Sequence, residues 1–301
     1  MSTGATPAIR CRGVTKRFGH VTALDQLDLS VPEGAVVGFL GPNGAGKSTT
    51  IRILLDLARP DAGEVEVLGH DPRTGGPALR RRIGYVPGEL RLDDRIDVGE
   101  TLRSWARIRG DVDPAYVDEL CQRLSLDPTR ATSALSSGNR RKVGLVGAFM
   151  ARPELLILDE PTSGIDPLVQ IEVLDLINEV RAEGRTVFLS SHSLSDVQRV
   201  ADEVVVIRDG RTVGGGDLDE LRRSTRQEFV VWFAASPPVD ALHDLPSVSD
   251  LEIRDREVRG TIVGDPNPLL RLLAEHPVAH VVLPEPELEE AFLRLYGGGD
   301  R

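Results

Sequence analysis

Short hydrophobic runs alternate with amphipathic stretches through the first two thirds of the chain. Three of the runs have the length and apolar character of buried parallel strands, namely Ala35–Gly41, Leu155–Glu160 and Thr186–His192. Between the last two, Gln170–Glu183 repeats apolar residues at helical spacing, and Gly184 follows where that helix should end. Strand–helix alternation of this kind predicts an α/β layered core with right-handed crossovers.

Two other segments differ from this core. At the front, Ile9–Phe18 and Leu27–Val31 have the pattern of antiparallel strands. From about residue 89 to 150 the chain has helical spacing over Glu100–Arg109 and Ala115–Leu124, with no strand signal between them. We therefore expect an antiparallel β subdomain that leads into the core, and an α-helical subdomain inserted within it.

After about Leu221 the pattern changes again. Alternating polar and apolar residues predict strands at Phe229–Ala234, Leu251–Arg254, Val258–Val263 and Val278–Leu283. Helical spacing is found at Asn267–Glu275 and Pro286–Tyr296. The chain is therefore expected to divide into a main domain, residues 1–221, and a small C-terminal α+β accessory domain, residues 222–301.

Charge and hydropathy narrow the classes of function. The formal net charge is −11, which argues against nucleic-acid binding because a duplex is bound by a basic surface. No apolar run approaches the roughly 18–20 residues that span a bilayer, and MSTGATPAIRCRG at the N-terminus lacks the apolar core of a signal peptide. We expect a cytoplasmic protein unless a partner holds it at a membrane. Cys11 and Cys121 are expected to be buried, inert thiols rather than a metal site or a disulfide.

Residues 41–48 read Gly-Pro-Asn-Gly-Ala-Gly-Lys-Ser, which fills the pattern Gly-x4-Gly-Lys-Ser/Thr between an expected strand and a helical stretch. In this context the glycines let backbone N–H groups surround phosphates, and the helix adds the positive end of its dipole. Lys47 would reach the terminal phosphates and Ser48 would ligate Mg²⁺. A phosphate-binding P-loop is predicted, rather than a glycine-rich turn with a chance lysine. Its binding residues are Gly41, Pro42, Asn43, Gly44, Ala45, Gly46, Lys47, Ser48 and Thr49.

Two carboxylates end the run Leu155–Glu160. Asp159 is placed to hold Mg²⁺ beside the P-loop, and Glu160 would polarise the attacking water as its hydrogen-bond acceptor. His192 ends the next expected strand, and open α/β sheets bind ligands at the carboxyl ends of their strands, so we expect it to contact the γ-phosphate. Taken alone, the acidic pair could belong to an ordinary buried strand, and the histidine could be structural.

The stretch Leu135-Ser-Ser-Gly-Asn139 is the most specific feature of the middle region. Ser136 can cap a helix that runs through Arg152, and Gly138 allows a close backbone approach, so the segment can form a second phosphate-binding helix start. Together with the elements above, in this order, it resembles the ATP-binding subunits of ABC transporters. Their signature is Leu-Ser-Gly-Gly-Gln, from which Ser137 and Asn139 depart. The resemblance spans about residues 8–221.

The resemblance implies how these parts work together. Two subunits pair head to tail, so that Ser136, Ser137, Gly138 and Asn139 of each signature close on the ATP of the partner. Asp166 belongs to the family's D-loop at the dimer interface, and Phe18 matches the aromatic position that stacks on adenine, although it could instead pack in the core. The implied ligands are ATP and Mg²⁺. The implied partners are a second ATP-binding subunit and a separate transmembrane permease, which would hold the chain at the cytoplasmic face of the plasma membrane.

The C-terminal stretch that ends with Leu288–Tyr296 resembles the extensions of ATPases that serve ABC-2-type exporters; the alternative is a packing appendage without a ligand. We therefore expect the ATP-hydrolysing motor subunit of an exporter, most like the multidrug-resistance ATPases. The alternatives are an importer ATPase, a soluble ABC ATPase of translation or DNA repair, and a regulatory nucleotide-binding subunit. Cargo and the choice between homodimer and heterodimer stay open.

One departure from the family concerns the stretch Gly84–Leu90, which reads Gly-Tyr-Val-Pro-Gly-Glu-Leu. The family has a glutamine at the position of Gly88, in its Q-loop, where the amide oxygen faces Mg²⁺ or the attacking water. Gly88 has no side chain to make that contact. Either a turn brings the Glu89 carboxylate to the metal, or the loop is a hinge and Glu89 faces solvent or the permease.

Overall fold

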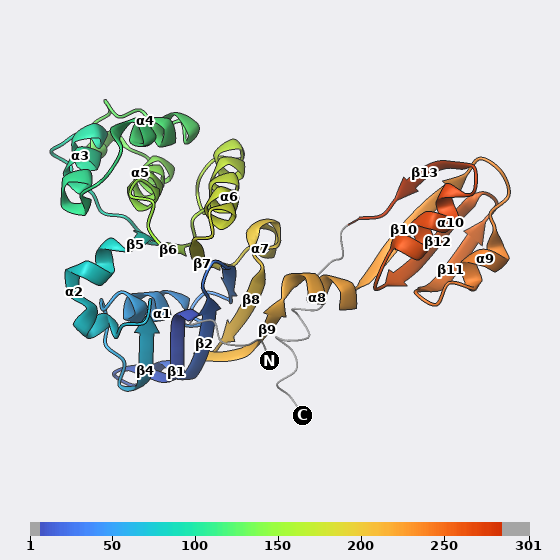
Figure 1. The fold of residues 1–301 in the computed structure, drawn as a ribbon, viewed down its shortest axis with the longest axis horizontal. Helices are drawn as coiled ribbons and strands as arrows, with labels where there is room; N and C mark the ends of the chain where they lie inside the picture. The colour runs from blue at the N-terminus through green and yellow to red at the C-terminus, as the bar shows by residue number, and fades with distance from the viewer. Residues whose placement is uncertain (1–6, 285–301) are drawn as a thin grey trace. The chain divides into compact units, whose positions relative to one another are not determined.

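The computed structural model describes residues 7–284, and the chain divides into two compact units, Met1–Gly215 and Gly216–Arg301 (Figure 1). The strands of the central sheet of the first unit are β3 (Val36–Leu40), β5 (Ile83–Val86), β6 (Leu155–Asp159), β7 (Thr186–Ser191), β8 (Glu203–Arg208) and β9 (Arg211–Asp217). Within the described residues their order is β5-β6-β7-β3-β8-β9, and β5 through β8 run parallel. Every residue of β3, β6 and β7 is buried, which explains why these strands read as continuous apolar runs.

A second, antiparallel sheet packs beside the first. Its strands, in the order β2-β1-β4, are β1 (Pro7–Phe18), β2 (Val21–Pro32) and β4 (Ala62–Val67). One hydrophobic core joins both sheets and includes Ile9, Leu24, Phe39 and Phe188, the last two with ring centroids 5.2 Å apart. The expected front strands lie within β1 and β2. No expectation covered β4, because only Val67 in it is buried and its alternation is weak.

Four helices accompany these sheets within the first unit, namely α1 (Lys47–Leu54), α2 (Pro72–Arg81), α6 (Pro167–Ala182) and α7 (Leu194–Val200). Helix α6 begins three residues before the apolar stripe suggested. The Asp166 side chain caps it by accepting from the Val169 amide, and Pro167 occupies its first turn. Gly184, with φ of 74°, follows its end as expected.

The inserted helical subdomain contains α3 (Val98–Arg109), α4 (Pro114–Arg123) and α5 (Ser137–Phe149), which Figure 1 shows gathered together in green. A short 3₁₀ turn, Thr132–Ala134, precedes α5. Asp97, Asp113 and Ser136 cap the three helices with their side chains. Helix α5 was expected to run through Arg152 but ends at Phe149. Arg152 itself has a left-handed backbone, with φ of 44°, which no helix continues.

The second unit contains the strands β10 (Arg226–Phe233), β11 (Val248–Arg254), β12 (Glu257–Val263) and β13 (Val278–Val282), and the helices α8 (Leu218–Ser224), α9 (Val239–His243) and α10 (Asn267–Ala274). The sheet order is β11-β12-β10-β13. Phe229, Val231, Leu242, Ile262 and Leu269 belong to a core of its own. The helix expected at residues 286–296 lies outside the described residues. Among residues 7–284, no helix has the length and apolar character needed to cross a membrane.

Candidate functional site: a nucleotide-binding edge

The carboxyl ends of β3, β6 and β7 meet at one edge of the parallel sheet. The register pairs Asp159 with Ser190 and Leu40 with Ser191. The P-loop after β3, the acidic pair at the end of β6 and His192 after β7 therefore leave the sheet at the same level. Ligands of open parallel sheets bind at such an edge.

The P-loop has the backbone shape that its glycines allow. Gly44 and Gly46 have positive φ, of 83° and 113°, in a region that other residues adopt only at a cost. A Cβ on Gly41 would lie 2.5 Å from the Ile207 oxygen, so glycine is required there for space. Gly46 precedes α1 without a side-chain cap among the described residues. The first amides of this helix point toward the loop, which suits an anion.

Lys47 is almost fully buried at the base of this loop. Its Nζ donates to the carbonyl oxygen of Gly41 at 2.5 Å and to that of Pro42 at 3.3 Å. The same Nζ lies 3.7 Å from the Glu160 carboxylate. A cation held between the P-loop and the end of β6 is suited to attract an anion, such as a phosphate group, to the point where both elements meet.

Asp159 is buried, and the hydroxyl of Ser190 donates to its Oδ1 at 2.5 Å. This hydrogen bond fixes the carboxylate through Oδ1 and does not involve its other oxygen, Oδ2. Residues 7–284 contain no group of three or more His, Cys, Asp or Glu that could hold a metal ion. Mg²⁺ is nevertheless compatible with this edge, because it is usually bound by one or two protein oxygens together with phosphates and water. An ordered carboxylate at Asp159 and an exposed hydroxyl at Ser48 are donors of that kind.

Glu160 follows directly and has a left-handed backbone, with φ of 53°. Its amide donates to the Ser190 carbonyl oxygen at 3.1 Å. Its side chain is one-fifth exposed, and Nδ1 of His192 donates to its Oε2 at 2.5 Å. The His192 side chain is 59% exposed, so it is not packed as a structural histidine. Lys47, Glu160 and His192, which lie far apart in the sequence, thus form one chain of contacts.

The signature segment packs against the D-loop, residues 163–166, of the same chain. Ser136 Oγ accepts from the Asn139 amide at 3.2 Å, which is the expected helix cap. A Cβ on Gly138 would lie only 2.5 Å from the Gly164 oxygen. The glycine of the signature is therefore required for close packing within one subunit, whatever it contacts across an interface.

Asp166 is tied to the same helix by a second contact. Lys142 Nζ donates to Asp166 Oδ2 at 3.1 Å. The hydrogen bond from the Val169 amide, followed by the one from Lys142, holds the pKa of the Asp166 carboxyl below its usual value. Asp166, the last residue of the D-loop, thereby holds this loop to α5 through Lys142 and to α6 as the N-cap of that helix.

Phe18, at the end of β1, is 51% exposed, which excludes the alternative that it packs in the core. Lys16 Nζ lies 5.3 Å from the centre of its ring. An exposed aromatic face beside the P-loop sheet is suited to stack on a base.

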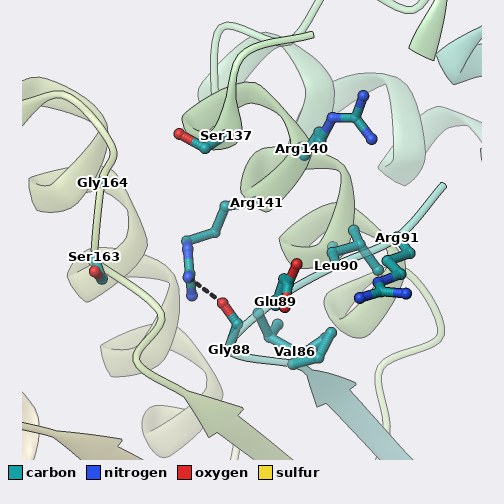
Figure 2. A pocket seen from close by; sticks show the side chains of 12 residues that line it. Val86, Gly88, Glu89, Leu90, Arg91, Ser137, Arg140, Arg141, Ser163 and Gly164 are labelled. Atoms are coloured by element: carbon teal, nitrogen blue, oxygen red, sulfur yellow. Dashed lines mark hydrogen bonds between the residues drawn. The ribbon is translucent and has the colours of Figure 1, made fainter. Parts of the chain in front are cut away.

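The Q-loop leads from β5 toward the helical subdomain. A Cβ on Gly88 would lie 3.1 Å from Asp159 Oδ2, so a side chain at this position would press against the buried carboxylate. The next residue, Glu89, lines a pocket of about 430 Å³ together with Arg140 and Arg141 of α5 and Ser163 of the D-loop. Figure 2 shows the Glu89 carboxylate inside that pocket. Within residues 7–284 it has no hydrogen bond or ion pair, and its role toward a metal stays a prediction.

The likeness to known proteins agrees with this geometry. Residues 24–163 match the sequence model of a protein family, which is described as ABC transporter. A daunorubicin resistance ATP-binding protein of Streptomyces coeruleorubidus is 36% identical over 310 residues, which cover 99% of this chain and 98% of that protein. The chain belongs to the ABC transporter family. Family membership identifies ATP as the ligand and ATP hydrolysis as the reaction.

One further relative in sequence and one solved structure resemble this ABC ATPase. A Nod factor export ATP-binding protein of Ralstonia nicotianae is 32% identical over 307 residues, which cover 98% of this chain and 95% of that protein. Among solved structures, an ATP-binding subunit of an ABC transporter matches with a TM-score of 0.66 and 31% identity, over 72% of this chain and 92% of that one.

Sequence reasoning missed two residues that hold the site together, Ser190 and Arg141. Ser190 is fully buried in a strand of apolar neighbours and bonds Asp159. A buried serine at the end of a parallel strand is a signal that could have been read. Arg141 follows the signature and donates to three backbone carbonyl groups. Nothing in its local sequence indicates those partners.

Proposed function

We propose that this ABC ATPase is the motor subunit of an exporter, in which closure of two ATP-bound subunits drives a separate transmembrane permease. The observation that carries the proposal is the chain of contacts from Lys47 through Glu160 to His192 at the carboxyl edge of the sheet. The relatives named for drug resistance and for Nod factor export support the direction of transport. Their cargoes are their own, and the cargo of this chain is set by its permease.

The residues of the edge take the following roles in this proposal. The P-loop, from Gly41 to Thr49, surrounds the phosphates, Lys47 binds the terminal ones, and Phe18 stacks on adenine. Ser48 and Asp159 would hold Mg²⁺, which neutralises the charge that develops on the phosphates. Glu160 accepts a hydrogen bond from the attacking water, and His192 orients the Glu160 carboxylate and contacts the γ-phosphate.

The signature and the D-loop act in the dimer. Residues Ser136, Ser137, Gly138 and Asn139 close on the ATP held by a second subunit, and Asp166 lies at that interface. The exposed Asp166 side chain and the capped start of α5 support this role. Because ATP then contacts both subunits, it binds the closed dimer more tightly and shifts the population toward it. The permease would hold the pair at the cytoplasmic face of the membrane.

The test is the variant Glu160→Gln, measured in the purified full chain. We expect kcat to fall by about a hundredfold or more, because the amide no longer accepts the proton of the water with the basicity of a carboxylate. ATP affinity, measured by direct titration, should stay within about twofold of wild type. Near-normal steady-state hydrolysis would remove Glu160 from its role.

Lys47→Ala is the matched counterpart, because Lys47 is proposed to bind and Glu160 to react. Removing a charged hydrogen-bond donor should weaken ATP binding itself by roughly tenfold to a hundredfold. Equal ATP affinity in wild type and in this variant would contradict the assignment of the P-loop.

A further inference from the structure

Arg141 of α5 connects three loops of the site through their backbone. Its Nη2 donates to the Gly88 carbonyl oxygen at 2.6 Å, a bond drawn in Figure 2. Its Nη1 donates to the Glu160 carbonyl oxygen at 2.6 Å and to that of Asp159 at 3.1 Å. One guanidinium therefore holds the Q-loop and the end of β6 at the same time.

These partners are carbonyl oxygens rather than carboxylates. Burial lowers the pKa of Arg141, while the nearby charges of Asp159 and Glu160 raise it. An ion pair tolerates changes of angle, whereas the planar fork of an arginine requires its acceptors in fixed directions. The arrangement is therefore sensitive to the position of the Q-loop backbone relative to Glu160.

The Q-loop passes so close to Asp159 that a side chain at position 88, such as the family's glutamine, would crowd this carboxylate. A side chain at position 88 would start 3.1 Å from Asp159 Oδ2 and 3.5 Å from its Cγ. Asp159 is buried and held by Ser190, so it cannot move freely away. The Q-loop is connected to the site through its backbone instead, by the hydrogen bond from Arg141 to the Gly88 carbonyl oxygen.

Glu160 depends on such support. A left-handed backbone is unfavourable for a glutamate and persists only where neighbouring contacts determine it. Its amide donates to the carbonyl oxygen and the hydroxyl group of Ser190, and its own carbonyl oxygen accepts from Arg141 at 2.6 Å and from the Ser163 amide at 3.2 Å. If the Q-loop moves, Arg141 follows it or releases it, and in either case the Glu160 carbonyl group loses or changes the shorter of its two hydrogen bonds.

We propose that Arg141 is a positioning residue that transmits the position of the Q-loop, through the Gly88 carbonyl group, to the backbone that aims the Glu160 carboxylate. The proposal rests on the role proposed above for Glu160. It makes hydrolysis, and not ATP binding, dependent on the Q-loop.

The test compares Arg141→Lys with Arg140→Lys in the purified full chain. Lysine keeps the positive charge, but its single ammonium group cannot reproduce the fork to Gly88 and Glu160. Arg140 is the matched control, since it lines the same pocket and donates instead to the Leu135 carbonyl oxygen and to Asp94, each at 3.4 Å. We expect Arg141→Lys to lower kcat by roughly tenfold to a hundredfold, the range that misplacement of a reacting group by about 1 Å produces.

The readouts separate positioning from folding. ATP affinity, titrated directly, should stay within about twofold of wild type in both lysine variants. A misfolded site would lose ATP affinity, so its retention shows that the site is folded. Arg140→Lys should keep wild-type kcat. Wild-type kcat in Arg141→Lys or in Arg141→Ala would overturn the proposal, and so would a loss confined to ATP affinity.

Glu160→Gln, measured alongside, distinguishes a failure of the role proposed for Arg141 from a failure of the role proposed for Glu160. If Glu160→Gln is inactive while Arg141→Lys hydrolyses ATP like wild type, the inference about Arg141 fails and the proposed role of Glu160 stands. If Glu160→Gln remains active, the role of Glu160 fails, and with it the proposal that Arg141 acts by aiming it.

Discussion

At the scale of single residues, Gly88 and Glu160 show how much of this site depends on backbone rather than on side chains. Glu160 keeps a left-handed backbone that costs a non-glycine residue about 1–2 kcal/mol, and contacts from Ser190 and Arg141 offset that cost. Gly88 lacks a positive φ, so what its glycine provides is space beside Asp159, where a Cβ would be crowded, and not a special backbone conformation.

This geometry gives a prediction about Gly88→Gln, the change that restores the family's residue. Crowding of the buried Asp159 carboxylate should cost roughly 1 kcal/mol, and kcat should fall about fivefold instead of rising. Gly88→Ala isolates the Cβ and should show most of the loss. The measurement is steady-state phosphate release, and a higher kcat in Gly88→Gln than in wild type would show that the Q-loop has room for a side chain.

At the scale of elements, helices α4 and α6 are joined by one arginine. Arg123 of α4 donates to Glu172 at 2.5 Å and to both oxygens of Glu179 of α6, at 2.6 and 2.8 Å. The hydrogen bonds with Glu179 raise the pKa of Arg123, and those from Arg123 hold the pKa of Glu179 below its usual value. The helical subdomain is thereby joined to helix α6 of the core.

Removing this arginine, as in Arg123→Gln, should destabilise the helical subdomain by about 1–2 kcal/mol, a value reduced by the exposure of Glu179. Trp105 of α3 reports unfolding of that subdomain once the other tryptophan is removed by Trp232→Phe. The stabilisation from Glu179 is fully present above about pH 5 and is lost as pH falls through its lowered folded pKa. The difference between wild type and variant in urea unfolding should therefore shrink toward pH 3.

The control is Arg82→Gln, which breaks an exposed two-bond pair with Glu154. Exposed pairs contribute about 0–1 kcal/mol, so this variant should unfold close to wild type. A loss of stability as large as that of Arg123→Gln would mean that the α4–α6 contact stabilises the protein no more than an exposed ion pair does.

The elements that sequence could predict are those whose burial is complete or strictly periodic. Strands β3, β6 and β7 and the stripe of α6 are of this kind, because a buried element needs an unbroken apolar pattern. Helix α2 was missed because Gly76 has φ of 59° in its middle and Pro77 follows, so its sequence reads as a loop.

The residues of the site also differ in whether the sequence could predict them. The P-loop and the acidic pair could be predicted, because their chemistry is contained in a few consecutive residues. The contacts of Arg141 could not, because the three carbonyl groups that it holds are 18, 19 and 53 residues away in the chain. Such contacts follow from strand order and helix placement, which local sequence does not specify.

At the scale of the whole molecule, the chain consists of two units with separate cores. Each contains one of the two tryptophans, Trp105 in the first unit and Trp232 in the second, where its ring nitrogen donates to Glu257 at 2.9 Å. The proposed nucleotide site belongs entirely to the first unit.

Single-tryptophan variants should therefore respond differently to ATP with Mg²⁺. At about 100 times Kd, the ligand should stabilise the first unit by about 2.7 kcal/mol and shift the urea midpoint reported by Trp105 upward. The midpoint reported by Trp232 should not move. A common shift of both signals would show that the two units unfold as one.

Helix α5 contacts the D-loop through Gly138 and Lys142, and the Q-loop and Glu160 through Arg141, over little more than one turn. Each residue added to an α-helix rotates the following side chains by about 100°. A single-codon insertion or deletion between Gly138 and Arg141 would therefore disconnect the glycine contact from the other two, even with all three contacting residues retained. Over evolutionary time this stretch can exchange residues, as Ser137 and Asn139 indicate, but its length is expected to stay constant.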